Sequence, residues 1–248
     1  MDLPFSQQPL PRPVRALIVA HGQPSDPGPA EARLAGLAAQ VAAHLPGWQV
    51  DAATLAAPGA LAAAVGRLGP GARVFPLFMA GGWFVCSHLP QRLAEAGARD
   101  WRVLEPLGCD VAVHDLAVAL VVGAGPATSV VLAAHGSGKS RVPSDIAQAL
   151  AQKIAARSGI ARVEAAFIDQ SPRIAEASGH GPGSICLPYF AAEGGHVSDD
   201  LPKALRQAGF QGRVLPPLGN DPRLPMIIAE AIRRDVPVCA QVCRWQRP

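Results

Sequence analysis

The sequence predicts an α/β protein made of two tandem similar halves, each a four-stranded parallel sheet flanked by helices, with a cleft between the halves. Three observations favour this fold class. The chain repeats itself at a nearly constant offset, which indicates a duplicated architecture. Short apolar segments alternate with helical patterns through both copies. Of the 248 residues, 49% are hydrophobic and 17% charged, a globular balance with enough chain for two modest cores.

Three matched segments carry the repeat. They keep the same order in both copies: residues 16–22 with 130–136, residues 77–90 with part of 187–202, and residues 102–110 with 213–221. His21 in the first copy therefore corresponds to His135 in the second, whereas the first-copy residue that corresponds to His196 is Phe84. Chance similarity between apolar strands could explain one such match but hardly all three.

The duplication also divides the chain into domains. A stretch of small residues with Gly and Pro near 123–129 is typical of a linker. We expect a first half with few candidate ligands and a second half that binds metal. A proline-rich, flexible arm precedes them and a tail follows. The four parts in chain order are residues 1–13, 14–123, 124–240 and 241–248.

Four short, apolar, β-branched segments in each half are the predicted strands. They cover residues 16–20, 50–55, 73–78 and 102–104, and then 130–134, 162–168, 185–190 and 213–215. Apolar strands that alternate with helices favour a parallel sheet covered on both faces.

The predicted helices lie between these strands. Several have Ser, Asp or Pro near the start and Gly after the end, as helix boundaries often do. They cover residues 30–44, 59–68, 89–96, 110–121, 144–157, 172–178, 201–208 and 222–234. In such folds ligands bind beyond the carboxyl ends of the strands. His21, His135 and His196 all follow predicted strands, so His135 and His196 can be close in space.

Charge and hydropathy restrict the partners. The net charge is +3, without a basic run, so we expect no nucleic-acid partner. No apolar run reaches the ~18–20 residues of a membrane span, and the N-terminus lacks the apolar core of a signal peptide. We therefore expect no membrane partner and a cytoplasmic location.

The five cysteines are an odd number that does not suggest a disulfide framework. Cys86, Cys109 and Cys186 lie in or beside apolar segments, where a thiol behaves as a small hydrophobe. Cys239 and Cys243 form a Cys-x3-Cys pair, which cannot complete a metal or cluster site alone.

His135 and His196 are the candidate metal ligands. Imidazole suits divalent Co, Ni, Fe and Zn, and two protein ligands with open positions would hold a metal transiently. The alternative for each histidine is a hydrogen bond at a strand end. Two histidines at strand ends of one half, next to glycines, favour a site.

Acidic residues near this pair are candidate proton acceptors. Glu193 precedes Gly194 and Gly195 and is a candidate general base, although a solvated loop acid is nearly as good an interpretation. Asp169 is a further possible site acid. Asp199 and Asp200 begin a predicted helix, and favourable interaction with the helix dipole explains them sufficiently.

The first half has only one of the two imidazoles. Because Phe84 replaces the second, we expect this half to supply the wall of the cleft instead of ligands. His21 lines that cleft as a weak ligand or proton acceptor, or it only stabilises a turn. His114 lies in a helical pattern and is expected to be structural.

The loop after the second-half strand 130–134 carries charge. Lys139 and Arg141, together with backbone amides, could bind carboxylates of a ligand, or their charges are only solvated.

Residues 133–140 resemble a phosphate-binding P-loop, but Ala133 occupies the place of the first glycine, so nucleotide hydrolysis is not favoured. Ser137 is a poor hydrolase nucleophile because Gly-x-Ser-x-Gly is absent.

Residues 131–137 and 187–202 together resemble the class II chelatases of tetrapyrrole synthesis. The resemblance is closest to the CbiX-type sirohydrochlorin cobaltochelatases and ferrochelatases, and it spans roughly residues 14–235. It implies two α/β halves around a cleft and insertion of a divalent metal into a tetrapyrrole without ATP, in cobalamin or sirohaem synthesis. A non-catalytic metal or tetrapyrrole carrier on the same scaffold is the alternative.

The resemblance also implies roles for residues. His135 and His196 would bind the incoming Co²⁺, Fe²⁺ or Ni²⁺, which is a substrate and not a permanently bound cofactor, and Glu193 would assist catalysis. We expect one chain or a homodimer. The expected contacts of the tetrapyrrole are His21, Trp83, Phe84, Ser137, Lys139, Arg141, Tyr189, Gly194 and Gly195.

Overall fold

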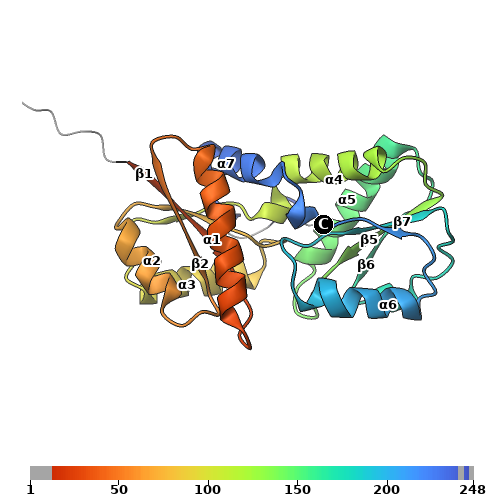
Figure 1. Cartoon of the computed structure of the whole chain (residues 1–248), viewed down its shortest axis with the longest axis horizontal. Coiled ribbons are helices and arrows are strands. Elements are labelled where there is room, and N and C mark those ends of the chain that lie inside the picture. Colours follow the sequence, from red (N-terminus) through yellow and green to blue (C-terminus); the bar gives the residue numbers. More distant parts are fainter. Residues whose placement is uncertain (1–12, 240–242, 246–248) are drawn as a thin grey trace, which may run out of the picture.

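Two four-stranded parallel sheets lie side by side (Figure 1). The computed structural model describes residues 13–239 and 243–245. The predicted arm, apart from residue 13, and most of the predicted tail lie outside them. The first sheet has the order β2-β1-β3-β4, with β1 (Val14–Ala20), β2 (Trp48–Thr54), β3 (Arg73–Pro76) and β4 (Arg102–Val103). The second has the order β6-β5-β7-β8, with β5 (Ser129–Ala134), β6 (Val163–Phe167), β7 (Ser184–Pro188) and β8 (Arg213–Val214).

The identical strand order confirms the predicted fold class of two tandem α/β halves. Register follows the repeat as well. Ala16 pairs with Val50 and Arg73, and its counterpart Val130 pairs with Val163 and Ile185. All of these pairs are parallel, so the carboxyl ends of the strands meet at one edge of each sheet.

Helices cover both faces of the sheets. They are α1 (Pro27–Ala43), α2 (Ala60–Leu68), α3 (Leu89–Glu95), α4 (Val111–Gly123), α5 (Val142–Ser158), α6 (Leu201–Gln207) and α7 (Leu224–Arg234). A π-helical turn precedes α3 at Phe84–His88, and another precedes α6 at His196–Asp200. The helix predicted at 172–178 is only a 3-10 turn, Ile174–Glu176, because Pro172 and Gly179 leave too few residues for a stable helix. None of the described helices is long and apolar enough to cross a membrane.

Each half is completed by the last helix of the other. Helix α4 packs against α5 and β7 of the second half, and α7 packs against α1 and β3 of the first (Figure 1). Lys153 Nζ lies 2.8 Å from Asp115 Oδ1 and joins α5 to α4. Arg73 Nη1 donates to the Ile232 carbonyl oxygen at 2.9 Å and joins β3 to α7. The exchange holds the two halves together.

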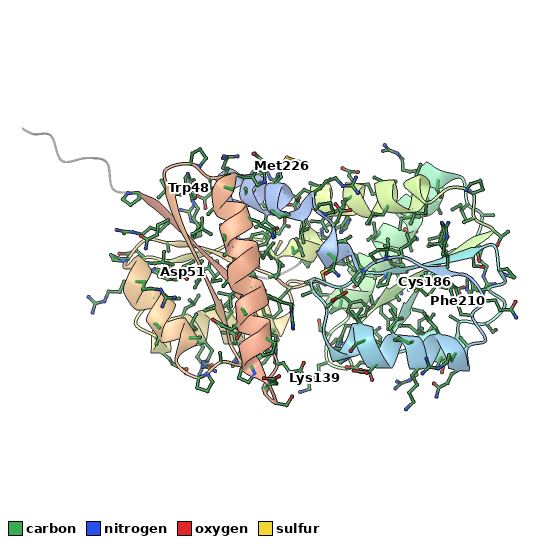
Figure 2. The ribbon with its side chains drawn as sticks, viewed as in Figure 1. Trp48, Asp51, Lys139, Cys186, Phe210 and Met226 are labelled. Atoms are coloured by element: carbon green, nitrogen blue, oxygen red, sulfur yellow. The ribbon has the colours of Figure 1, made fainter. Side chains whose placement is uncertain are left out.

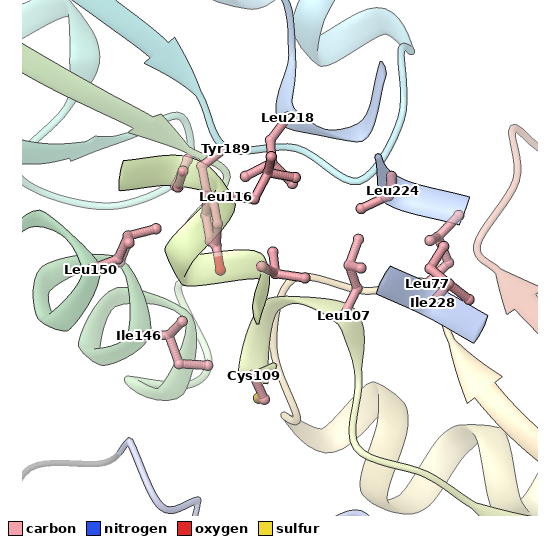
Figure 3. Packing of buried hydrophobic residues seen from close by; sticks show 14 of the residues in the cluster. Leu77, Leu107, Cys109, Leu116, Ile146, Leu150, Tyr189, Leu218, Leu224 and Ile228 are labelled. Carbon is pink, nitrogen blue, oxygen red and sulfur yellow. The ribbon is translucent and has the colours of Figure 1, made fainter. Parts of the chain in front are cut away.

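The exchanged helices produce one core shared by both halves. In β1, Ala16 and Ile18 point into this core, whereas Leu17 and Val19 point to the opposite face. Figure 3 shows side chains from both halves meeting in the shared core, Leu107 and Leu116 among them with Leu218 and Ile228. Burial on both faces explains the continuous apolar runs of the strands.

The chain returns to the first sheet after α7. Asp235 Oδ2 lies 2.7 Å from Arg102 Nη1 and 3.2 Å from Arg73 Nη2. The Val238 amide then donates to the Val103 carbonyl oxygen at 3.1 Å, and Pro237 forms an antiparallel bridge with Leu104. The segment 235–239 is therefore attached to the β4 edge of the first sheet.

His114 on α4 is buried near the boundary of the two halves. Its Nε2 donates to the Gly108 carbonyl oxygen at 2.9 Å, and its ring centroid lies 4.5 Å from that of Trp245. Burial lowers the pKa of His114 to about 4, although the hydrogen bond to Gly108 acts in the opposite direction. The position agrees with a structural role.

Acid will destabilise the fold through His114. Between pH 6.5 and 4 the unfolded chain binds a proton at this residue and the folded chain does not, so stability is lost as the pH falls through this window. The loss is about 3 kcal/mol in the free energy of unfolding. His114→Gln retains an N–H donor for Gly108 but does not titrate. Urea unfolding at pH 7.5 and pH 4 should show the extra loss in the wild type, and equal losses in both proteins would contradict the assignment.

Candidate metal centre

The imidazoles of His135 and His196 meet beyond the carboxyl ends of the second sheet. Their Nε2 atoms are 3.1 Å apart, and the rings are nearly perpendicular at 87°, with centroids 4.4 Å apart. The side chains are 43% and 50% exposed, respectively. His135 follows β5 directly, and His196 begins the π-helical turn after β7. Two residues far apart in the sequence are thus brought together.

Hydrogen bonds determine which ring nitrogens carry hydrogen. His135 Nδ1 lies 3.0 Å from the Gly136 carbonyl oxygen, and His196 Nδ1 lies 2.8 Å from Asp200 Oδ2. Both oxygens only accept, so each Nδ1 is the donor and each neutral ring has its lone pair on Nε2. Two lone pairs that face each other cannot hydrogen-bond. This arrangement suits a shared electrophile, namely a metal ion or a proton.

The pair fits an open metal site. For a metal–nitrogen distance of about 2.1 Å, nitrogens 3.1 Å apart subtend an angle of about 95° at the ion, as two adjacent ligands do. Within the described part of the chain, no three of its His, Cys, Asp and Glu residues are arranged as a metal site.

Gly136 is required for the position of His135. Its φ is +76°, and a Cβ there would lie 2.7 Å from Gln170 Cγ and 2.9 Å from Phe167 Cβ. This conformation directs the Gly136 carbonyl oxygen toward the imidazole. A residue with a side chain would adopt the same positive φ only under strain. Asp169, predicted as a possible site acid, lies behind the ring with Oδ2 3.6 Å from His135 Nδ1.

The π-helical turn places Asp200 next to His196. The turn is closed by a hydrogen bond from the Leu201 amide to the His196 carbonyl oxygen, and the Val197 and Ser198 amides donate to the Gly194 carbonyl oxygen before it, at 2.8 and 3.0 Å. Sequence reasoning explained Asp200 by the helix dipole and missed this contact. The available signal was the spacing of four between His196 and Asp200 on a predicted helix start. A carboxylate behind a metal-binding imidazole orients the ring and raises its basicity.

Glu193 lies on the same loop as His196. Its described partner is Asn220, whose Nδ2 donates to Glu193 Oε1 at 2.7 Å, and not either imidazole. The loop is held by the close approach of Gly219, where a Cβ would lie 2.1 Å from the Ala191 carbonyl oxygen. Glu193 is exposed, so its carboxylate is accessible to a ligand.

The charged loop after β5 is also accessible. The Lys139 amide donates to Ser137 Oγ at 3.2 Å, while the Lys139 side chain lies in the region between the two halves (Figure 2). Arg141 forms a loose ion pair with Asp145, at 3.9 Å, and its side chain is 77% exposed. Both cations can therefore meet an anionic ligand.

The first half reproduces this backbone with different side chains. His21 Nδ1 donates to the Gly22 carbonyl oxygen at 3.0 Å, and Gly22 has a φ of +78°, as in the second half. Phe84 begins the corresponding π-helical turn, and its ring centroid is 5.0 Å from that of His21. His88 stands where Asp200 stands.

An aromatic cluster therefore replaces the imidazole pair in the first half. It consists of His21, Phe78, Trp83, Phe84 and His88. Trp83 stacks on His88, with centroids 5.2 Å apart and planes at 21°, and remains 65% exposed. The Phe84 and His88 centroids are 4.8 Å apart.

This cluster and the charged loop approach each other across the two halves. A Cβ at Gly82, the residue before Trp83, would lie 3.9 Å from Ser140 Oγ. The loop that carries Trp83 is thus close to the loop that follows His135.

The expectation that Tyr189 contacts a substrate is corrected by the structure. Tyr189 is buried in the shared core, and its hydroxyl donates to the Gly108 carbonyl oxygen at 2.8 Å. An aromatic residue after an apolar strand can end in the core because the hydroxyl finds a buried acceptor.

The sequence matches a known family model. The CbiX model matches residues 129–235, which include both imidazoles. A search of curated proteins found no match. A solved structure described as CbiX, the terminal enzyme for biosynthesis of siroheme in denitrifying bacteria, is 46% identical. It has a TM-score of 0.82 and covers 89% of this chain and 98% of its own.

Two more distant structures share the fold. SirB from Bacillus subtilis with Fe³⁺ is 14% identical, with a TM-score of 0.65, and the match covers 90% of this chain and 95% of that one. The sirohydrochlorin chelatase SirB from Bacillus subtilis subspecies spizizenii in complex with cobalt is 15% identical, with a TM-score of 0.66. That match covers 90% and 94%, respectively.

Proposed function

This chain belongs to the CbiX family of class II chelatases, and we propose that it inserts a divalent metal ion into sirohydrochlorin without ATP. The observation that carries the proposal is the pair of Nε2 atoms of His135 and His196, 3.1 Å apart, with both ring hydrogens directed elsewhere. The product is a metallated tetrapyrrole for sirohaem or cobalamin synthesis.

The metal is a substrate that the two imidazoles hold and then release. Asp200 and the Gly136 carbonyl orient the rings of His196 and His135 before the metal arrives. Two protein ligands bind more weakly than a closed four-ligand site, so transfer to four pyrrole nitrogens is downhill. Iron and cobalt are the proposed metals, since the SirB structures hold Fe³⁺ and cobalt, and nickel is the third.

The tetrapyrrole lies between the two halves in this proposal. Trp83 and Phe84, with His21, form an apolar wall for its face, because aromatic rings stack favourably on planar π-systems. The approach of Gly82 to Ser140 supports one shared site.

Polar groups of the second half hold the carboxylates of the tetrapyrrole. Lys139 and Arg141 supply exposed cations. Ser137 supplies its hydroxyl, because its amide already donates to Gln170 Oε1 at 2.7 Å, and the loop at Gly194 and Gly195 supplies backbone amides. Hydrogen bonds from a cationic side chain to a carboxylate are stronger than hydrogen bonds between neutral groups. A Cβ at Gly194 would meet nothing within 4 Å, so a ligand can approach the backbone there.

Insertion releases two protons for each metal bound, because the divalent ion replaces two pyrrole N–H hydrogens. Glu193 accepts one of them, its carboxylate being accessible and held by Asn220. His21 is the second acceptor. Its Nδ1 hydrogen is engaged by Gly22, which leaves the Nε2 lone pair for the proton.

The test is multiple turnover in the absence of ATP. Sirohydrochlorin is mixed with Co²⁺, Fe²⁺ or Ni²⁺ and a small fraction of one equivalent of protein, and the absorption change is followed under anaerobic conditions. We expect many product molecules per chain with at least one metal. Product that stops at one equivalent of protein identifies a carrier and contradicts an enzyme.

A further inference from the structure

Four of the five cysteines gather where the C-terminal segment reaches the first half. Cys86 lies in the π-helical turn before α3, and Cys109 lies in the 3-10 turn before α4. Cys239 and Cys243 belong to the C-terminal segment, of which the structure describes residues 235–239 and 243–245. The fifth, Cys186, is buried in β7 of the other half.

Cys86 and Cys239 form an outer pair. Cys86 Sγ lies 3.1 Å from the Gly81 carbonyl oxygen and 3.6 Å from the Cys239 carbonyl oxygen, and its single S–H is shared between these two acceptors. The Cys86 thiol therefore contacts the backbone of Cys239, and the Cys239 side chain branches from the carbon next to that carbonyl group. Both residues are partly exposed. Burial raises the pKa of Cys86, and the nearby charge of a Cys239 thiolate raises it further.

Cys109 and Cys243 form an inner pair, and both are buried. A hydrogen bond with the Cys243 side chain and burial raise the pKa of Cys109 far above its usual range. The Cys109 carbonyl oxygen also accepts from Trp245 Nε1 at 2.9 Å and from Arg244 Nη2 at 2.7 Å. Both thiols of the inner pair are shielded from solvent, and a reactive cysteine needs to be accessible, so we assign the reaction to the outer pair.

A tetrahedral metal site is not the best interpretation of these thiols. No three metal-ligating side chains in the described residues are arranged around one point, whereas a structural zinc site needs four. The corresponding positions of the second half carry no thiols, since Ser198 and Asn220 occupy the places of Cys86 and Cys109. The thiols occur in the half that the C-terminal segment covers.

We infer that Cys86 and Cys239 are a redox-active dithiol that low-molecular-weight disulfides oxidise to an intramolecular disulfide. Burial holds Cys86 as the thiol and its Sγ already contacts two carbonyl oxygens, so we assign the first attack to the Cys239 thiolate. It displaces one thiolate of the small disulfide, and this thiolate leaves and takes up a proton. Cys86 then loses its proton and attacks the Cys239 sulfur, which displaces the second small thiol. Two protein thiols are oxidised by two electrons, and one small disulfide is reduced to two thiols.

The disulfide would connect the C-terminal segment to the part of the first half that carries the aromatic cluster. Cys86 lies in the same π-helical turn as Phe84, and the Gly81 carbonyl that it binds belongs to the loop before Trp83. Oxidation would therefore restrain the aromatic cluster. This inference does not depend on the proposed metal insertion.

The test uses the full-length chain, reduced and then exposed to excess oxidised glutathione. We expect titratable thiols in denaturant to fall from five to three, and peptide mapping to find Cys86 linked to Cys239. Cys86→Ser should instead accumulate a glutathione adduct on Cys239, which Cys86 can no longer resolve. Cys186→Ala is the matched control and should still lose two thiols.

A second readout is thermal unfolding. A link between positions 86 and 239 closes a long loop, so oxidation should raise the unfolding midpoint of the wild type by roughly 5 °C or more. The midpoint of Cys239→Ser should not respond. Three results would overturn the inference. The oxidised protein could retain five titratable thiols, its disulfide could join Cys109 to Cys243, or one equivalent of bound metal could protect the thiols from oxidation.

Discussion

Replacing His196 by alanine will abolish metal insertion while leaving the fold intact. The side chain is half exposed and is not part of a described core cluster, so its loss costs little stability. The substitution removes one of two ligands and leaves His135 alone, which cannot hold a divalent ion in competition with water. We expect the insertion rate to fall by at least about 100-fold, because losing even a residue that only hydrogen-bonds to a metal ligand lowers metal affinity or activity by about 10- to 100-fold.

Two further variants sharpen this test. Asp200→Asn retains an acceptor for His196 Nδ1 but removes the negative charge, so we expect a smaller loss, of about 10-fold. His44→Ala removes an exposed histidine at the end of α1 and serves as the matched control, with activity like the wild type. Insertion rates are compared with Co²⁺ affinity from calorimetry and with urea unfolding. Full activity of the His196 variant would contradict the assignment of the pair.

Placing histidine at position 84 and aspartate at position 88 will create a second metal site. The first half already has His21 with its Nδ1 bound to the following glycine and a π-helical turn that begins at Phe84. The Phe84 ring is 5.0 Å from His21, compared with 4.4 Å between the rings of His135 and His196. Phe84→His with His88→Asp therefore reproduces both the pair and its carboxylate.

The measurement is the number of Co²⁺ ions bound per chain. We expect one in the wild type and two in the double variant, and one again when His196→Ala is added. Phe84→His alone should bind the second ion more weakly, because Trp83 stacks on His88 and no carboxylate orients the new imidazole. If the double variant still binds one Co²⁺ ion per chain, the backbone at His21 and Phe84 must differ from the backbone at His135 and His196, in addition to the difference in side chains.

Many features of the fold could be predicted from local patterns. Apolar runs at 16–20 and 130–134 indicated the central strands, because a strand buried on both faces must be apolar throughout. The repeat then implied the same strand order in both halves. The predicted strands also placed His135 and His196 at strand ends. The structure shows that these strands are neighbours in the sheet and brings the two residues together.

Other features depended on contacts between distant segments. Tyr189 was expected at the substrate, but an acceptor from the other half, the Gly108 carbonyl oxygen, holds its hydroxyl in the core. Asp200 was explained by its position in a helix, although its contact with His196 is what bears on the site. The gathering of Cys86 with Cys239 also needed the return of the chain to the first sheet.

The sequence by itself determined the class of fold, the duplication and the histidines that end at the carboxyl edge of the second sheet, because periodicity and repeated motifs are local properties. Only the tertiary structure decided that α4 and α7 exchange partners and that both Nε2 atoms face each other. Burial of apolar surface has no direction, so an apolar helix such as α4 can cover either sheet. The tautomer of each imidazole is likewise set by whichever acceptor folding places beside Nδ1.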